Sequence, residues 1–162
     1  MELPERKHPR LKNYDYSQPG YYYVTIHTAS PEIRLSSVGR GLAPAEAVIR
    51  LTRLGEIAEN QLLDLQSRYS CVRLDKYVIM PTHIHAIICI ENGENRPSLT
   101  DVICAYKSLT TRIANLTFDT PGRKQFQISF FETVLRNKKA YQECWRYTED
   151  NPQKWLVGQD DG

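Results

Sequence analysis

Two histidines, His83 and His85, stand one residue apart inside the apolar segment YVIMPTHIHAIICI at residues 77–90. Alternate residues of a β-strand project from the same face, so both imidazoles would lie side by side while Ile84 faces the other way. Two neighbouring imidazoles can share a metal ion, or they can be hydrogen-bonded residues of a sheet surface. A metal site would need at least one further oxygen or nitrogen ligand from elsewhere in the chain.

A second pair of polar residues, Tyr147 and Asn151, is spaced four apart in the segment RYTEDNPQKW. On a helix these residues would lie on one face about a turn apart, which directs a phenol and a carboxamide the same way. The structural alternative is an amphipathic tyrosine and an asparagine that ends a helix before Pro152. Glu149 and Asp150 are rival ligands, but their helical positions turn them away from Tyr147 by about 200° and about 300°.

The elements that must position these residues follow from the periodicity of the apolar side chains. Alternation and β-branched residues predict strands at 21–28, 71–80, 83–91 and 126–136. Three- and four-residue spacing predicts helices at 52–68, 99–116 and 138–151, the last capped by Asn137 and stopped by Pro152. Residues 29–51 would form a hairpin or a flexible excursion. This order predicts a ferredoxin-like α+β fold, in which helices cover one face of an antiparallel sheet and an extra C-terminal helix follows.

Length and composition predict a single domain over residues 1–162, with a basic lead-in at about 1–20. The net charge of +2 permits a nucleic-acid partner without indicating one. There is no run of about 18 apolar residues and no apolar core of a signal peptide, so we expect a cytoplasmic protein with no membrane segment. The cysteines form no C-x-x-C pair and are expected to be reduced core residues. They are Cys71, Cys89, Cys104 and Cys144.

Four segments together resemble a known family: YVIMPTHIH, YKSLTTRIA, SFFETVLRN and WRYTEDNPQKW. In order and spacing they are similar to the single-tyrosine HUH transposases of bacterial insertion sequences, most closely the REP-associated tyrosine transposases. The resemblance covers about residues 10–157. Family members usually have Asn, Glu or Asp where Thr82 stands, and residues 29–51 are not diagnostic.

The resemblance implies the HUH nuclease fold, with His83, His85 and Asn151 as metal ligands and Tyr147 as the nucleophile. Mixed nitrogen and oxygen ligands suit magnesium in the cell, with manganese able to substitute. The implied activity is that of a DNA transposase, which cleaves and rejoins single-stranded DNA through a 5′-phosphotyrosine. The implied partner is single-stranded DNA with repeat or palindromic hairpin ends. The protein would be a nucleoid-associated monomer or homodimer in a bacterium.

Basic residues surround the predicted nucleophile, because residues 121–157 contain seven Lys and Arg against four acidic residues. This excess can attract phosphate, although each cation could equally belong to a solvated helix surface. The residues most expected to contact DNA are Lys107, Arg136, Lys138, Arg146 and Lys154.

Two other functions remain open: a nucleic-acid-binding module without catalysis, and a metal-dependent hydrolase without a covalent intermediate. A phenol with a pKa of about 10 is only about a thousandth ionised at neutral pH, so a tyrosine nucleophile needs help from its surroundings. The change Tyr147→Phe separates the three functions. It would abolish covalent cleavage, leave a hydrolase partly active and leave a binding module unaffected.

Overall fold

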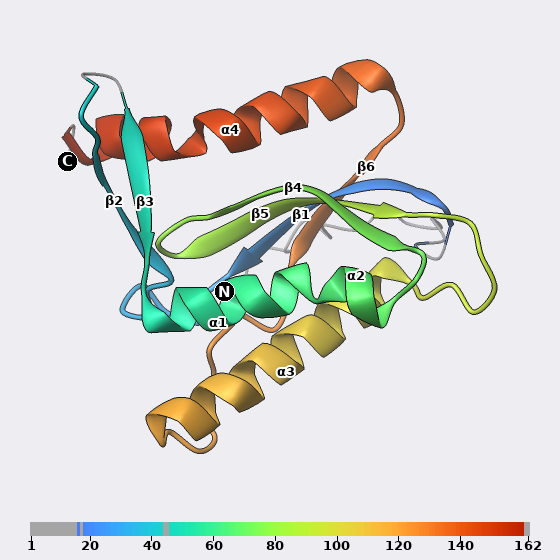
Figure 1. Ribbon diagram of the computed structural model, residues 1–162, viewed down its shortest axis with the longest axis horizontal. Helices are drawn as coiled ribbons and strands as arrows, with labels where there is room; N and C mark the ends of the chain where they lie inside the picture. The colour runs from blue at the N-terminus through green and yellow to red at the C-terminus, as the bar shows by residue number, and fades with distance from the viewer. Residues whose placement is uncertain (1–15, 17, 44–45, 161–162) are drawn as a thin grey trace, which may run out of the picture.

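A four-stranded antiparallel sheet forms the centre of the computed structural model, which describes residues 16, 18–43 and 46–160 (Figure 1). Its strands, in spatial order, are β4 (Val72–Ile79), β5 (His83–Ile90), β1 (Gly20–His27) and β6 (Phe131–Leu135). The helices are α1 (Arg53–Leu63), α2 (Leu65–Arg68), α3 (Leu99–Phe118) and α4 (Lys138–Asp160). α1, α2 and α3 lie on one side of the sheet and α4 lies on the other (Figure 1). This arrangement confirms the predicted ferredoxin-like α+β fold with an extra C-terminal helix. Most of the expected basic lead-in lies outside the described residues.

The sheet has one apolar face and one mixed face, because side chains alternate along each strand. On β1, Tyr22, Val24 and Ile26 are at most 1% exposed and belong to the core that includes residues of α1 and α3. Ile84 and Ile88 of β5 extend the same core. The intervening residues of both strands, including the two histidines, therefore face the side on which α4 packs.

Residues 29–51 contain a hairpin, the first of the two arrangements expected for this segment. β2 (Ser36–Arg40) pairs antiparallel with β3 (Ala47–Leu51) in a separate two-stranded sheet. The hydroxyl of Ser36 donates to the Ile79 carbonyl at 2.9 Å, which ties the base of the hairpin to the end of β4. Both strands contact α4, and Figure 1 shows them beside its C-terminal half. The hairpin thus supports the end of α4.

α4 continues through Pro152 to Asp160, so the predicted stop at Asn151 is wrong. Proline has no N–H, and the carbonyl four residues earlier loses its helical partner. That carbonyl belongs to Thr148, while the β2–β3 hairpin packs against α4. Tertiary contacts therefore override the local preference of proline. As predicted, Asn137 caps the helix, since its Oδ1 accepts from the Ala140 N–H at 2.8 Å.

Three smaller predictions also need correction. The helix expected at 52–68 is divided at Asp64 into α1 and α2. The strand expected at 126–136 is shorter, because Phe126 makes only an isolated bridge with Thr28 and β6 begins at Phe131. Cys104 is exposed on α3, so it is not a core residue, whereas Cys71 and Cys89 are buried.

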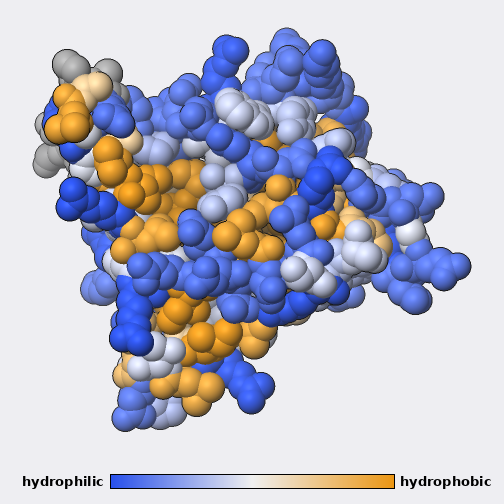
Figure 2. Space-filling model, viewed as in Figure 1, coloured by the Kyte–Doolittle hydropathy of each residue, from blue (hydrophilic) through white to orange (hydrophobic). Residues whose placement is uncertain are grey.

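No helix among the described residues combines the length and hydrophobicity needed to cross a bilayer. Figure 2 shows hydrophobic residues gathered over the middle of the viewed face, where the sheet and α1 lie. The surface over α4 is mainly hydrophilic in the same view.

Candidate functional site

Three imidazoles, not two, lie together on the face of the sheet that α4 covers. The ring centroids of His83 and His85 on β5 are 4.7 Å apart. His27, at the end of β1, is the register partner of His83, and their ring centroids are 5.5 Å apart. The sequence analysis missed His27, although alternation along β1 places it on the same face as Tyr23 and Thr25.

The His85 ring is fixed by two residues of β1. Its Nδ1 lies 3.0 Å from the hydroxyl oxygen of Thr25, and its ring stacks on that of Tyr23 with centroids 5.4 Å apart. His85 is only 7% exposed. With Nδ1 occupied by the hydroxyl, Nε2 is the ring nitrogen that remains for another partner.

Burial favours the neutral form of all three imidazoles. Burial lowers the pKa of His83 to about 4, the nearby His27 acts in the same direction, and a hydrogen bond with Asn151 opposes the shift. Burial, followed by His83 and then His27, lowers the pKa of His85 to about 3. Burial also lowers the pKa of His27. Neutral imidazole is the form that binds metal ions.

α4 brings the two predicted residues of its own to the histidines. Tyr147 is 44% exposed, and its ring lies edge-on to that of His85 with centroids 5.6 Å apart. Asn151 is 7% exposed and lies within reach of His83, whose pKa it raises against the larger effect of burial. Trp155, which the helix carries beyond Pro152, reaches the His83 ring with centroids 6.0 Å apart. The structure thus places His83, His85, Tyr147 and Asn151 together, while their chemical roles stay predictions.

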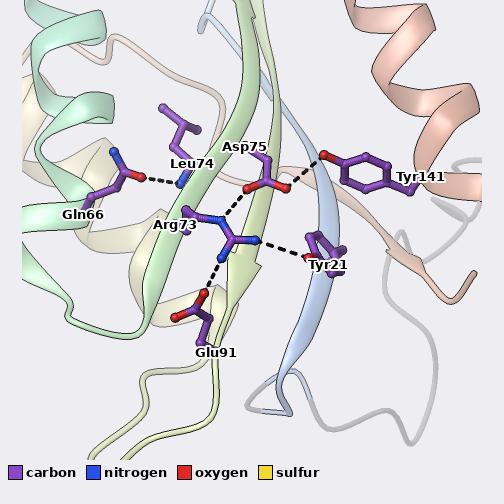
Figure 3. Close-up of polar contacts among 7 residues, drawn as sticks. All are labelled: Tyr21, Gln66, Arg73, Leu74, Asp75, Glu91 and Tyr141. Carbon is purple, nitrogen blue, oxygen red and sulfur yellow. Dashed lines mark hydrogen bonds and ion pairs between the residues drawn. The ribbon is translucent and has the colours of Figure 1, made fainter. Parts of the chain in front are cut away.

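The N-terminal half of α4 is anchored to the edge of the sheet by a polar network (Figure 3). Asp75 lies at a bulge in β4, where it accepts from the Tyr141 hydroxyl at 3.0 Å and from Arg73 Nε at 2.7 Å. Arg73 also pairs with Glu91 and donates to the Tyr21 hydroxyl at 3.2 Å. A bulge redirects the side chain of the extra residue. Here the extra residue is Asp75, whose carboxylate accepts the hydrogen bond from Tyr141 of α4.

The two acidic rivals on α4 do not face the imidazoles. Glu149 pairs with Lys76 of β4, whose ammonium also lies 4.1 Å from the centroid of the Trp145 ring. Asp150 lines an exposed hollow beside Tyr147. Glu149 therefore lies on another side of the helix, as predicted, whereas Asp150 shares the Tyr147 hollow, so the expectation that it turns away from Tyr147 is wrong. A rotation of about 300° is only about 60° in the opposite direction, which keeps Asp150 near Tyr147.

The predicted DNA-binding cations separate into three groups. Arg146 and Lys154 line a hollow of about 360 Å³ with Tyr147, and the Lys154 ammonium lies 4.7 Å from the centroid of the Tyr147 ring. Glu143 stands on the same rim. Arg136 and Lys138 line another hollow, of about 530 Å³, at the start of α4.

Lys107 lies elsewhere, on α3 across the sheet from α4. It is 8% exposed, and its ammonium donates to the carbonyls of Gln127 at 3.1 Å and Ile128 at 2.6 Å. The structure therefore does not bring Lys107 to the histidines, and its charge is used to hold a loop.

The donor set fits a divalent metal only when Asn151 is included. Within the described part of the chain, no three His, Cys, Asp or Glu side chains are grouped closely enough to hold an ion. His83 and His85 supply neutral imidazoles, and Asn151 supplies an amide next to His83. Two nitrogen donors and one amide oxygen leave coordination positions open, as a catalytic metal requires.

Comparisons with known proteins address the fold. No protein-family model matches the chain. An uncharacterized protein of Haemophilus influenzae is 25% identical over 170 residues, which cover 94% of this chain and 91% of the relative. The solved structure of a REP-associated tyrosine transposase bound to a REP hairpin is similar with a TM-score of 0.66 and 18% identity, over 90% of this chain and 73% of that chain. A protein assigned as a transposase in Deinococcus radiodurans is similar with a TM-score of 0.53 and 14% identity, over 87% of this chain and 95% of that chain.

These similarities define the class of the fold. The chain shares the fold of these transposase structures, and in it a four-stranded antiparallel sheet carries helices on both faces while the last helix lies over the histidines. The resemblance found in the sequence motifs is confirmed at the level of the fold.

Proposed function

We propose that this protein cleaves and rejoins DNA strands as a transposase, with Tyr147 as its nucleophile. The observation that carries the proposal is the placement of an exposed tyrosine ring edge-on to His85, beside the His83 and Asn151 pair. A nucleophile must be open to its substrate and lie next to the groups that orient the reacting phosphate. Tyr147 meets both conditions.

The proposed substrate is single-stranded DNA next to a repeat or palindromic hairpin. Support comes from the similar transposase structure, which holds a REP hairpin, and from the cations along α4. Arg146 and Lys154 share a hollow with Tyr147, while Lys138 is the first residue of the helix and Arg136 lies just before it. Cations spaced along one helix can contact successive phosphates of a flexible strand.

His83, His85 and Asn151 are the residues that would hold a divalent ion, magnesium in the cell with manganese able to substitute. When bound, such an ion withdraws charge from a non-bridging phosphate oxygen. The protein contributes orientation: Thr25 holds the His85 ring through Nδ1, and Asn151 engages His83. Trp155 packs against His83 and shields that side of the site.

The reaction we propose conserves one phosphodiester. The Tyr147 oxygen bonds to phosphorus as the bond from phosphorus to the 3′ oxygen breaks, which leaves a 5′-phosphotyrosine and a free 3′-hydroxyl. The phenol loses a proton and the 3′ oxygen gains one, so no proton is consumed overall. Because the ester is retained, another 3′-hydroxyl can reverse the step and join new ends without ATP. Hydrolysis by water would only cut the strand.

The test is to incubate the purified protein with a labelled single-stranded hairpin from repeats flanking its gene, with magnesium or manganese, followed by denaturing electrophoresis. We expect a metal-dependent protein–DNA adduct that Tyr147→Phe abolishes. Tyr141→Phe is the matched control: it removes a hydroxyl from the same helix that is bound to Asp75, and the adduct should persist. Cutting without an adduct by an active Tyr147→Phe protein would replace the proposal with hydrolysis, and binding without cutting would replace it with a binding module.

A further inference from the structure

A basic hollow of about 440 Å³ lies between the C-terminal half of α3 and the segment 122–128. Three exposed cations, Arg112, Arg123 and Lys124, line it, and no carboxylate is among its described lining residues. Nor does any of the three form an ion pair with another residue that the structure describes. Figure 1 shows α3 and the loop after it on the side of the sheet away from α4, so this hollow is separate from the Tyr147 site.

The wall of the hollow is held by polar contacts, most of them partly buried. The Asn115 side chain donates to the Arg123 carbonyl at 2.9 Å and accepts from the Gln125 amide at 2.8 Å. Lys107 bonds to the carbonyls of Gln127 and Ile128 in the same segment. These contacts fix the backbone that carries Arg123 and Lys124, which reduces the conformational entropy lost when a ligand binds.

Gln127 lines both this hollow and a second hollow at the His27 end of the sheet. The second hollow, of about 210 Å³, is also lined by His27 and Thr82. The backbone N–H of Gln127 donates to the His27 carbonyl at 2.9 Å. A bound polymer that runs past His27 at this end of the sheet would therefore reach Gln127 and then the basic hollow.

We propose that this hollow binds backbone phosphates of the same DNA strand whose reacting phosphate lies at His83 and Tyr147. The identity of the ligand as DNA rests on the proposed function. A single small anion would gain little from solvated cations, whereas a polyanion engages them together and releases condensed counterions. Ile128, which is 81% exposed on the rim, adds an apolar surface against which a sugar or base can pack.

The experiment compares two double variants with the same change in charge. Arg112→Gln with Arg123→Gln removes two cations of the hollow, and Arg53→Gln with Arg68→Gln removes two exposed cations that lie outside it. Binding of a labelled hairpin with a single-stranded flank is followed by fluorescence anisotropy over a series of salt concentrations. Loss of two phosphate contacts should reduce the slope of log affinity against log salt by about 1.4 to 1.8, depending on whether the contacted DNA is single- or double-stranded. At about 0.1 M salt the same slope corresponds to roughly a 25- to 60-fold loss of affinity, if the electrostatic part vanishes near 1 M.

The control variant should keep the wild-type slope, and Arg112→Lys with Arg123→Lys should bind like wild type. An unchanged slope in the Gln variant of the hollow, with an unchanged circular dichroism melting curve, would overturn the inference. So would displacement of the DNA by inorganic phosphate beyond a chloride control of equal ionic strength, because that result would indicate a single-anion site.

The covalent assay separates the two proposals. If the protein forms the Tyr147 adduct but Arg112→Gln with Arg123→Gln binds DNA like wild type, only the proposed role of the hollow is refuted. If the same variant has a reduced salt slope but the wild type forms no adduct, the hollow binds DNA and the proposed cleavage by Tyr147 is refuted.

Discussion

Acidification should destabilise this protein through its buried histidines. The pKa values of His83, about 4, and His85, about 3, lie below the ordinary value of 6.5. Below about pH 6.5 the two histidines therefore bind protons in the unfolded chain but stay neutral in the folded chain, so the free energy of unfolding falls as the pH drops. For a base whose pKa is lower in the folded state, the full stability is present at pH values above the pKa of the unfolded state. It is lost as the pH falls from that value to the pKa of the folded state.

The size of the effect follows from the two shifts. Between about pH 7.5 and about pH 5, each histidine that stays neutral in the folded state costs roughly 2 kcal/mol, so the pair costs about 4 kcal/mol if the two sites act independently. His27, whose pKa is also lowered, adds to the loss in the same direction. Since a domain of ordinary stability has only about 5 to 15 kcal/mol, such a loss is easy to measure.

The assay is urea unfolding followed by circular dichroism at several pH values, with EDTA present so that no metal ion competes with protons. Between about pH 6 and about pH 5 the two histidines should contribute a slope of roughly 2 to 3 kcal/mol per pH unit. The double variant His83→Asn with His85→Gln cannot take up these protons, so its slope should be smaller by that amount whatever its absolute stability. Equal slopes in the two proteins would refute the reasoning, because they would mean that both imidazoles are solvated in the folded state.

Two further changes probe the elements that support the site. In Gly55→Ala the new Cβ would lie 1.8 Å from the Leu35 carbonyl oxygen, so we expect a loss of roughly 2 kcal/mol or more in the free energy of unfolding; Gly39→Ala, which meets no atom within 4 Å, should be close to neutral in the same urea titration. Tyr141→Phe keeps the ring but loses the 3.0 Å bond to Asp75, and thermal unfolding should show a loss of about 1 kcal/mol; an unchanged stability would mean that the network does not anchor α4.

The features that the sequence predicted correctly depend on local periodicity. The order of strands and helices follows from alternation and from three- to four-residue spacing, and neither depends on distant residues. The same holds for the shared face of His83 and His85 and for the four-residue spacing of Tyr147 and Asn151. Each pair is fixed by the geometry of one element, so its members had to lie together once that element formed.

The features that were missed depend on how distant segments meet. His27 joins the cluster only because the β1 and β5 register places it opposite His83. The path of α4 through Pro152 depends on a hairpin that begins more than a hundred residues earlier in the chain. Lys107 is different, because the sequence did contain the signal: it follows Ile103 by four residues and precedes Thr110 by three, so it lies on the buried stripe of α3.

The position of α4 explains how one site can combine a buried amide with an exposed phenol. The helix is held near its start by the Tyr141 bond to Asp75 and near its end by the β2–β3 hairpin. Between these points its inner face places Asn151 against the sheet, and Tyr147, one turn earlier, lies at the margin, where it is 44% exposed. Lys154 and Arg146 lie beside that open margin. A helix fixed at both ends does not need to move to admit a phosphate, so we expect the strand to enter along the cationic side of α4 and to meet a site that is already assembled.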